Sequence, residues 1–186
     1  MDFRELLHTR RAIRAYSSRN VEETTVNALM GAATQAPSAM NAQPWAFAIV
    51  QDAATLKRYS DRAKALLLAA EPDTKTRHYR SMLQDENFNI FYDATTLIVI
   101  CCKERGQYTA ADCWLAAENL MLAACDMGLG SCPIGFAVPV LNDREIKQEL
   151  CIPSNGEAVA PIIVGYPRQP SNAVPRAVPT VLSWIR

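Results

Sequence analysis

The sequence has no excess of charge and few residues of the types that bind metals. Its 19 Lys and Arg residues balance 19 Asp and Glu residues, which argues against nonspecific nucleic-acid binding because that function needs a basic surface. His8 and His78 are the two histidines, and the six cysteines include no CxxC pair. We therefore expect no metal site, no disulfides and no nucleic-acid partner.

Long apolar runs are missing as well. Apolar runs such as residues 66–70 and 97–102 are too short to span a bilayer, and the charged N-terminal stretch contains no apolar signal region. We therefore expect a cytoplasmic protein without a membrane partner. The chain has 186 residues, 49% of them hydrophobic, so we expect a single domain over residues 1–186.

What is present is an alternation of helical and strand patterns. Three residue pairs have the spacing of a capping box at a helix start: Asp2 with Glu5, Asn20 with Glu23, and Asn142 with Glu145. Strands are predicted over 45–50, 95–102 and 159–166, and the longer helices over 53–70 and 108–127. The strand at 95–102 is apolar on both faces and should be central. This order predicts a three-layer α+β or α/β sandwich.

Apolar segments at both ends of the chain and in one helix predict self-association. The first helix should turn Phe3, Leu6 and Leu7 inward, and the helix over 108–127 is apolar nearly all round, as is typical of a core or a subunit interface. The tail 167–186 contains four prolines and must be extended. It ends in VLSWI, which is too apolar for a loose tail. We expect this arm to dock on a sheet, its own or that of a second copy in a homodimer.

The most informative polar motif is RRAIRAY at residues 10–16, with arginines at positions 10, 11 and 14. If the first helix reaches them, its C-terminal end carries guanidinium groups that suit the helix dipole and the geometry of phosphate or carboxylate. The segment would then bind a small anionic ligand. A solvated basic helix end is the alternative.

Two further motifs place polar side chains or flexible backbone in turns. In PSAMNAQPW, Ser38, Asn41 and Gln43 either satisfy the backbone of their own turn or face a ligand. GLGSCPIGF at 128–136 places three glycines around a helix end, where the backbone passes close to another group. It is not a dinucleotide fingerprint. With no nucleophile or metal site predicted, we expect a bound cofactor to carry the chemistry.

Taken together, these segments resemble the nitroreductase family of FMN-dependent oxidoreductases. Five segments match in order: RRAIRAY, APSAMNAQPWAF, TTLIVI, AAENLMLAACDMGLGSCPIG and IIVGYP, followed by an arm with a late arginine before VLSW. The resemblance implies an α+β fold, a three-layer α/β/α sandwich whose mixed central sheet is flanked by helices. It also implies that the arm 167–186 is exchanged in a dimer.

The resemblance assigns FMN contacts to residues from four segments. It implies that the FMN phosphate and ribityl chain are bound by Arg10, Arg11 and Arg14, with Arg176 as a second phosphate ligand. Ala12 stands where a serine is common in the family, so a backbone contact alone remains there. Across the dimer interface, the implied neighbours of the flavin are Pro37, Ser38, Asn41 and Gln43. The turn past the isoalloxazine ring is Pro133, Ile134 and Gly135, and an asparagine contact is left open between Asn87 and Asn89.

The function implied by the resemblance is reduction of nitroaromatic, quinone or similar conjugated acceptors by NAD(P)H, in a ping-pong cycle without a protein acid or base. Two alternatives stay open: a flavin-dependent reductase or dehydrogenase of one metabolite, and a flavin-binding protein without turnover. The segment 60–92 bears on this choice. Its aromatic residues either shape an acceptor pocket or belong to the core; they are Tyr79, Phe88, Phe91 and Tyr92.

Overall fold

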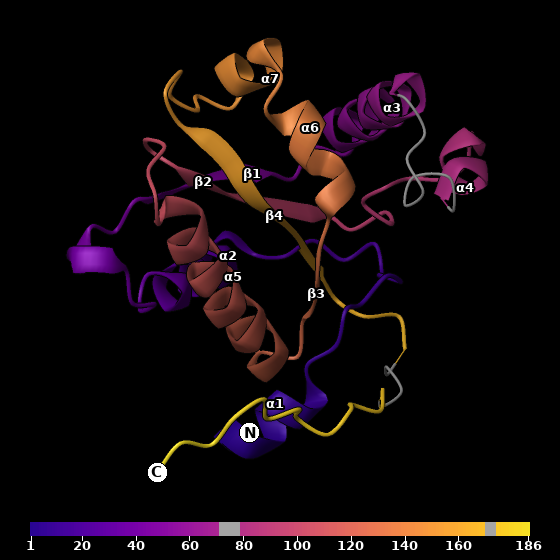
Figure 1. Cartoon of the computed structure of the whole chain (residues 1–186). Helices are drawn as coiled ribbons and strands as arrows, with labels where there is room; N and C mark the ends of the chain where they lie inside the picture. The colour runs from indigo at the N-terminus through magenta and orange to yellow at the C-terminus, as the bar shows by residue number, and fades with distance from the viewer. Residues whose placement is uncertain (71–78, 170–173) are drawn as a thin grey trace.

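In the computed structural model, which describes residues 1–70, 79–169 and 174–186, a four-stranded sheet lies between two layers of helices (Figure 1). The strands are β1 (Trp45–Val50), β2 (Thr96–Cys102), β3 (Gly130–Pro133) and β4 (Glu157–Gly165), in the spatial order β1-β2-β4-β3. Strands β1, β2 and β4 confirm the predicted ones to within two residues. Strand β3 lies in the glycine-rich segment, for which only a turn was expected.

The α+β class is confirmed, but each pair of neighbouring strands is antiparallel where a mixed sheet was expected. Strands β2 and β3 do run in the same direction, because both are antiparallel to β4. Strand β4 inserts between them and removes the parallel pair that their connection would otherwise make. Within the described residues, parallel pairing is confined to an isolated bridge between Ala12 and Ser131.

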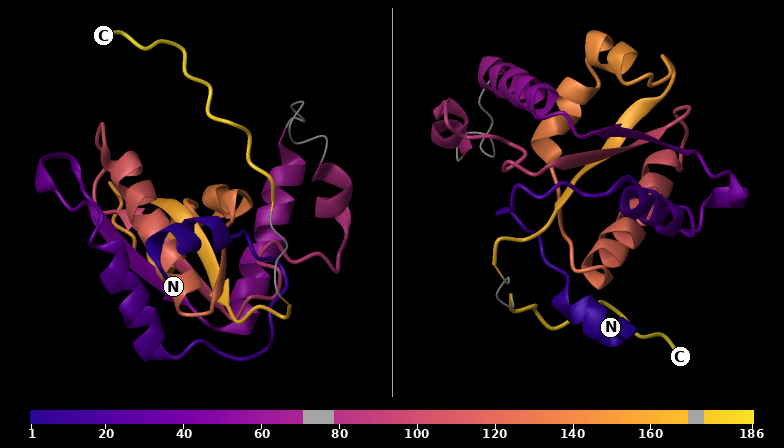
Figure 2. Two further views of the ribbon diagram at one scale, coloured as in Figure 1. Left: turned by 90° about the horizontal axis from the view of Figure 1, so that it is seen from below. Right: turned by 180° about the vertical axis from the view of Figure 1, so that it is seen from behind.

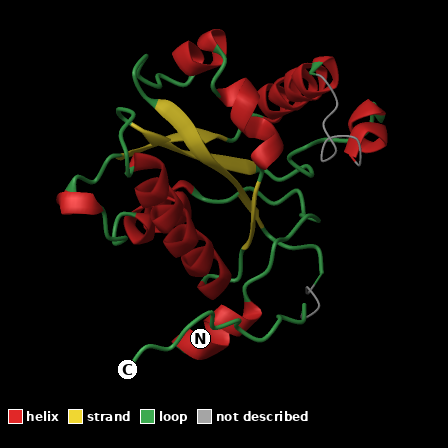
Figure 3. Ribbon diagram, in the orientation of Figure 1, coloured by secondary structure: helices red, strands yellow, loops and turns green. Residues whose placement is uncertain are grey.

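Helices cover both faces of the sheet (Figures 2 and 3). They are α1 (Phe3–Thr9), α2 (Glu23–Ala33), α3 (Ala53–Ala69), α4 (Arg80–Gln84), α5 (Thr109–Asp126), α6 (Val138–Leu141) and α7 (Arg144–Glu149), with short 3-10 turns η1 (Ala39–Asn41) and η3 (Gly135–Ala137). Helices α2 and α5 pack on one face, and α3 and α6 lie over the other. The α/β/α layering is therefore confirmed. Pro72, expected to break the helical pattern, lies outside the described residues.

The core consists of two clusters separated by the sheet. Along β2, alternate side chains enter different clusters: Leu97 and Val99 face α3 and α6, whereas Ile98 and Ile100 face α2 and α5. All seven residues of β2 are buried, which confirms that this strand is central. The alternation also sends the adjacent thiols at 101 and 102 to opposite faces. The six cysteines are all unpaired.

The helix starts follow the expected capping chemistry at one of three places. The Asp2 carboxylate accepts a hydrogen bond from the Glu5 N–H at 2.9 Å, as predicted. The predicted box at Asn20 is wrong, because α2 follows Glu22 without a side-chain cap. The box at 142 is also wrong: Asp143 caps α7, since the Asn142 amide is already bonded to both backbone groups of Ala158.

Both ends of the chain expose apolar side chains. Helix α1 buries no residue, so the prediction that it turns Phe3 and Leu7 inward is wrong for a single chain. The part of the arm over 174–186 forms no strand and leaves Leu182 and Ile185 more than nine-tenths exposed. It runs away from the body of the molecule (Figure 2). Docking of these residues on the chain's own sheet is therefore excluded.

The described residues offer neither a membrane span nor a metal-binding cluster. None of the described helices is both long and apolar enough to cross a bilayer. Among the same residues, no group of three or more His, Cys, Asp or Glu side chains is placed to hold a metal ion.

Candidate functional site

The arginine-rich segment 10–16 is extended, not helical. Helix α1 ends at Thr9, and Arg10 follows it with backbone angles φ −53° and ψ 130°. Three residues later the Ile13 N–H donates to the Ser131 carbonyl of β3 at 3.0 Å. The first helix therefore does not reach the three arginines, because the chain leaves the helix and follows the edge of the sheet.

The far end of this segment is held by the residues that follow β4. The Ser17 N–H donates to the Tyr166 carbonyl at 2.9 Å, and the Arg168 N–H donates to the Ala15 carbonyl at 3.0 Å. The segment therefore lies in a fork, with β3 on one side and the continuation of β4 on the other. Its position is fixed by backbone hydrogen bonds and does not depend on its side chains.

Two glycines make room for the segment. Gly130 and Gly165 are partners across β3 and β4. A Cβ atom on Gly130 would lie 2.7 Å from Cβ of Ile13, and one on Gly165 would lie 2.9 Å from Cδ1 of Tyr16. Real side chains do not approach so closely, so both positions need glycine for steric reasons. This confirms the prediction that the backbone of 128–136 passes close to another group.

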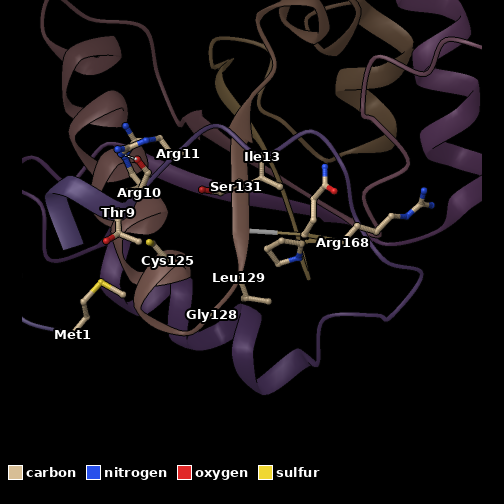
Figure 4. Close-up of a pocket in the computed structure, with 12 residues that line it drawn as sticks. Met1, Thr9, Arg10, Arg11, Ile13, Cys125, Gly128, Leu129, Ser131 and Arg168 are labelled. Atoms are coloured by element: carbon tan, nitrogen blue, oxygen red, sulfur yellow. Dashed lines mark hydrogen bonds between the residues drawn. The ribbon is translucent and has the colours of Figure 1, made fainter. Parts of the chain in front are cut away.

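A first cavity, here called the cation cavity, has a volume of about 470 Å³ and lies beside this segment. Arg10 and Arg11 line one wall, and Ser131 and Arg168 line other parts of it (Figure 4). In Figure 4 the side chains of Arg10 and Arg11 gather on one side, whereas the guanidinium of Arg168 points away from them. The cavity thus presents two cationic side chains from adjacent residues.

The charges of this pair are incompletely matched. Nε of Arg10 lies 3.4 Å from Oε1 of Glu118, a half-exposed carboxylate. Nη1 of Arg11 donates to the Arg10 carbonyl at 2.7 Å. Its Nε is buried and has no hydrogen-bond partner among the described residues. A buried donor without an acceptor is costly, so this arrangement favours an anion with several acceptor oxygens.

Arg176 joins the same cationic region from the arm. A neighbouring cavity of about 480 Å³ is lined by Arg11 and Arg176 together with Leu7, His8, Val174 and Pro175. Arg11 lines both cavities, so it connects the arm to the cation cavity. The structure therefore brings the late arginine next to the N-terminal arginines, although they lie at opposite ends of the sequence.

Arg14 lies elsewhere, in what we call the aromatic cavity. This cavity has a volume of about 580 Å³, and its lining residues are Arg14, Tyr79, Met82, Ile90, Tyr92, Pro133, Ile134, Gly135 and Phe136. The guanidinium carbon of Arg14 lies 5.8 Å from the centre of the Tyr92 ring. An extended chain covers about 13 Å in four residues, which explains why Arg10 and Arg14 reach different cavities.

The predicted residues Pro133, Ile134 and Gly135 all line the aromatic cavity, opposite the residues 79–92. Tyr79 and Phe136 meet edge to face across it, with ring centres 5.4 Å apart. Of the four aromatic residues that could either shape a pocket or belong to the core, Tyr79 and Tyr92 line the cavity. Phe91 is fully buried in the core, and Phe88 packs against the ring of Tyr92. The cavity can hold a flat ring system.

The segment 37–43 does not reach either cavity in a single chain. Its turn η1 projects from the edge of the molecule, apart from α1 and segment 10–16 (Figure 1). The Ser38 hydroxyl accepts a hydrogen bond from the Gln43 N–H at 3.0 Å, so it satisfies its own turn. The side chains of Pro37, Asn41 and Gln43 are exposed.

This turn is nevertheless held in a strained conformation. Met40, Asn41 and Gln43 have φ values of 51°, 56° and 45°, a region that costs energy for residues other than glycine. The buried carboxylate of Asp112 anchors the turn by accepting a hydrogen bond from the Ala39 N–H at 3.2 Å. Strain of this kind persists where the surroundings impose it, and it presents the 41–43 side chains outward.

The two asparagines that sequence reasoning left open do not line the three cavities described above. Asn89 uses both ends of its amide locally, donating to Asp93 at 2.9 Å and accepting from the Phe91 N–H at 2.9 Å. Asn87 is exposed, with its N–H donating to Asp85. The choice between them therefore stays open.

The thiols near the cavities are not activated. Cys125 lines the cation cavity, and Cys132 lies in β3 between the two cavities. Burial raises the pKa of both thiols above the usual value, although Arg10 and Arg14 act in the opposite direction at Cys132. Both groups therefore remain protonated at neutral pH and are poor nucleophiles.

Sequence reasoning missed several lining residues. Arg168 was not predicted, although it follows β4 by three residues, where a basic side chain after GYP could have drawn attention. Ser131 and Phe136 were quoted within the glycine-rich motif but given no role. Met82 and Ile90 carry no polar signal and could be recognised only from the structure.

Comparison with known proteins agrees with this arrangement. Residues 7–166 match the model of the nitroreductase family. A 5,6-dimethylbenzimidazole synthase of Rhodospirillum rubrum is 30% identical over 179 residues, which cover 88% of this chain and 81% of that protein. A 4-nitrobenzoate reductase of Pseudomonas putida is 26% identical, with 89% and 85% covered.

A solved structure supports the same assignment. The crystal structure of a nitroreductase with bound FMN from Bacteroides fragilis has a TM-score of 0.82 to this chain at 26% identity, covering 97% of this chain and 96% of that one. The family match, the relatives and the fold agree over most of the chain. The protein is therefore an oxidoreductase of the nitroreductase family.

Proposed function

We propose that the protein is an FMN-dependent oxidoreductase that uses NAD(P)H to reduce flat conjugated acceptors such as nitroaromatics or quinones. The observation that carries the proposal is the extended segment 10–16, which supplies cations to one cavity and Arg14 to another. A ligand with a phosphate at one end and an aromatic ring system at the other matches that pair of cavities. FMN has this form.

The cation cavity fits the phosphate of FMN. Arg10 and Arg11 line this cavity, and Arg176 lines the neighbouring one together with Arg11. Within the described residues, the ion pair recorded for these three arginines is that of Arg10 with the half-exposed Glu118, at 3.4 Å. The buried Nε of Arg11 lacks a partner among the described residues, and a phosphate oxygen would supply one. Ala12 brings no hydroxyl to this site, so charge and backbone groups would hold the phosphate.

The aromatic cavity fits the isoalloxazine ring. Its volume of about 580 Å³ is within the range of pockets that hold molecules of this size. Pro133, Ile134 and Gly135 would run along the ring, and Arg14 would face its polar edge. In this assignment Arg14 belongs to the ring and not, as the resemblance suggested, to the phosphate. A cation there would favour the anionic reduced form of the cofactor.

A homodimer would complete the site. The exposed residues Asn41 and Gln43 of one chain are the polar groups left without a cavity in that chain, and a second copy would bring them beside the ring. The apolar arm over 174–186 and the exposed Phe3 and Leu7 of α1 supply surface for this contact. The arm would then be covered by the second copy, which removes its exposed side chains from water.

Bound FMN would supply the redox chemistry by accepting a hydride from NAD(P)H and passing electrons to the acceptor in a separate step. The residues of this chain would bind and orient it. The cationic region would fix the phosphate, and the aromatic wall would leave one face of the ring open to each substrate in turn. The protonated thiols at 125 and 132 would take no part.

The proposal is tested by the visible spectrum of the purified protein after addition of FMN, followed by anaerobic addition of NADH or NADPH. We expect a bound flavin spectrum that is bleached by at least one of the two donors and recovers when a nitroaromatic or a quinone is added. A protein that binds no FMN would overturn the proposal. A bound flavin that neither donor bleaches would support a flavin-binding protein without turnover.

A second candidate is a flavin-dependent reductase or dehydrogenase of one specific metabolite. The aromatic wall formed by Tyr79, Tyr92 and Phe136 favours it, because a shaped cavity can select one acceptor. The relatives also include enzymes named for different reactions. Steady-state assays across nitroaromatics, quinones and other conjugated compounds distinguish the candidates: one strongly preferred acceptor indicates the metabolite enzyme, and broad turnover indicates the general reductase.

A further inference from the structure

A buried lysine outside both cavities holds one wall of the aromatic cavity. Lys64 lies on the inner face of α3 and is 7% exposed. Its ammonium group donates to the carbonyl of Phe88 at 2.8 Å, to that of Asp85 at 3.2 Å and to that of Glu86 at 3.4 Å. An ammonium group has three donors, and here three backbone carbonyls of one loop accept them.

The same face of α3 contacts the loop a second time. One helical turn before Lys64, the buried hydroxyl of Ser60 accepts a hydrogen bond from the Ile90 N–H at 3.0 Å. Two side chains of α3 at i and i+4, Ser60 and Lys64, therefore hold residues 85–90 by hydrogen bonds to their backbone. The loop lies between Met82 and Tyr92, which both line the aromatic cavity.

The shortest contacts of Lys64 are with backbone carbonyls, at 2.8 and 3.2 Å. The nearest carboxylate, that of Asp61, is 3.6 Å away and half exposed, so it contributes a screened interaction. Immediately after the loop, Tyr92 and Asp93 have φ values of 52° and 55°. This strained backbone needs surroundings that fix it, and the hydrogen bonds from Ser60 and Lys64 to the loop provide them.

We propose that Lys64 is a positioning residue of the aromatic cavity, which fixes the 82–92 wall against Phe136 and thereby sets the fit of the electron acceptor. This proposal rests on the assignment of that cavity to the flavin ring and acceptor. Lys64 touches neither cavity, so its effect would act through the position of Ile90 and Tyr92. FMN binding depends mainly on the cationic region and would be retained.

The test compares Lys64→Met with Lys57→Met in the full-length protein loaded with FMN. Lys57 lies on the same helix, pairs with Asp61 at 2.6 Å and is exposed, so it controls for loss of a lysine on α3. Hydrogen exchange and steady-state kinetics are measured for each. For Lys64→Met we expect faster exchange confined to 79–92 and an acceptor KM raised about tenfold, because a loosened wall must be ordered when the acceptor binds.

The dissociation constant for FMN should change by less than about twofold in Lys64→Met, because FMN binding depends mainly on the cationic region. An unchanged KM for the acceptor would overturn the proposal. Faster hydrogen exchange over the whole sheet would also overturn it, because Lys64 would then stabilise the fold in general and not the cavity wall. Ser60→Ala provides the test if Lys64→Met does not fold. It should show the same local exchange with a smaller rise in KM, and wild-type behaviour in both would also overturn the proposal. Failure of the FMN assignment would appear separately, as absent FMN binding in the wild-type protein.

Discussion

The cation cavity is lined by charged side chains with incomplete partners, whereas the aromatic cavity is lined by rings and aliphatic groups around Arg14. Both receive residues from one stretch of seven. A helix would have placed Arg10 and Arg14 about 6 Å apart on one face. The extended chain separates them instead. A short motif can therefore serve two chemically different ends of one ligand when backbone pairing stretches it.

The first prediction tests whether the site with its two cavities is completed within one chain or requires a second copy of the chain. In Leu182→Asp with Trp184→Asp, two exposed apolar side chains of the arm become charged. If the arm docks on a second copy, the four substituted positions of a dimer lose about 1.5–3 kcal/mol each, and the dimer should dissociate. Analytical ultracentrifugation measures this.

Ser183→Asp is the matched control for this pair, because it adds a charge between the two positions without removing an apolar group. It should remain dimeric. If the double variant has the same mass in solution as the wild-type protein, the arm is not part of the interface. In that case the outward-facing residues Asn41 and Gln43 would need another explanation.

The second prediction tests the cationic region formed by the cation cavity and the neighbouring cavity that contains Arg176. Arg10→Ala with Arg176→Ala removes two cations, each worth about 1.5–3 kcal/mol to a bound phosphate. The dissociation constant for FMN should therefore rise at least about a hundredfold, as measured by fluorescence titration of the apoprotein. Arg168→Ala is the control, because it lines the same cavity with its guanidinium turned away. An undiminished affinity in the double variant would contradict the assignment.

The third prediction breaks the connection between the cavities. Gly130→Ala would place a Cβ atom 2.7 Å from that of Ile13 and should lower the free energy of unfolding by about 1–3 kcal/mol, as overpacking does. It should also weaken FMN binding, because segment 10–16 is displaced. Urea unfolding gives the first effect and FMN titration the second.

Gly31→Ala is the control for this substitution, because its added Cβ would meet no atom within 4 Å. Alanine in the interior of a helix is favourable, so this variant should be as stable as the wild-type protein or slightly more stable. Equal behaviour of the two variants would show that the close approach of Ile13 to β3 is unimportant.

The fourth prediction tests the aromatic cavity. Arg14→Met removes the cation expected beside the ring, and the reduced anionic flavin should lose stability relative to the oxidised form. The two-electron reduction potential should fall by about 30 mV, which corresponds to about 1.4 kcal/mol, in a spectroelectrochemical titration. Arg14→Lys retains the charge and should show a smaller fall. An unchanged potential in Arg14→Met would place Arg14 away from the ring.

Much of the fold could be predicted from the sequence, because burial dictates it. The continuous apolar run 97–102 indicates a strand covered on both faces, and the structure confirms this. The antiparallel sheet could not be predicted, since it depends on the insertion of β4 between β2 and β3. No local sequence pattern indicates this order of the strands.

The candidate site was less predictable for a related reason. Arginines at 10 and 14 suit a helix face as well as an extended strand, and the choice is made by Gly130 and Gly165, which are distant in sequence. The residues Met82 and Ile90 carry no chemical signature, so their role in a cavity follows from the path of the loop alone. The charge pattern predicted which arginines gather in one region, but it did not predict that Arg14 lies in a different cavity.

One end of the site would recognise a phosphate and the other a flavin ring, and this pairing is the central prediction. It is tested most directly by comparing FMN with riboflavin, which has the same ring and no phosphate. We expect the wild-type protein to bind FMN at least about a hundredfold more tightly, and Arg10→Ala with Arg176→Ala to lose most of this preference while Arg14→Met keeps it. Equal affinities of the wild-type protein for the two flavins would contradict the account.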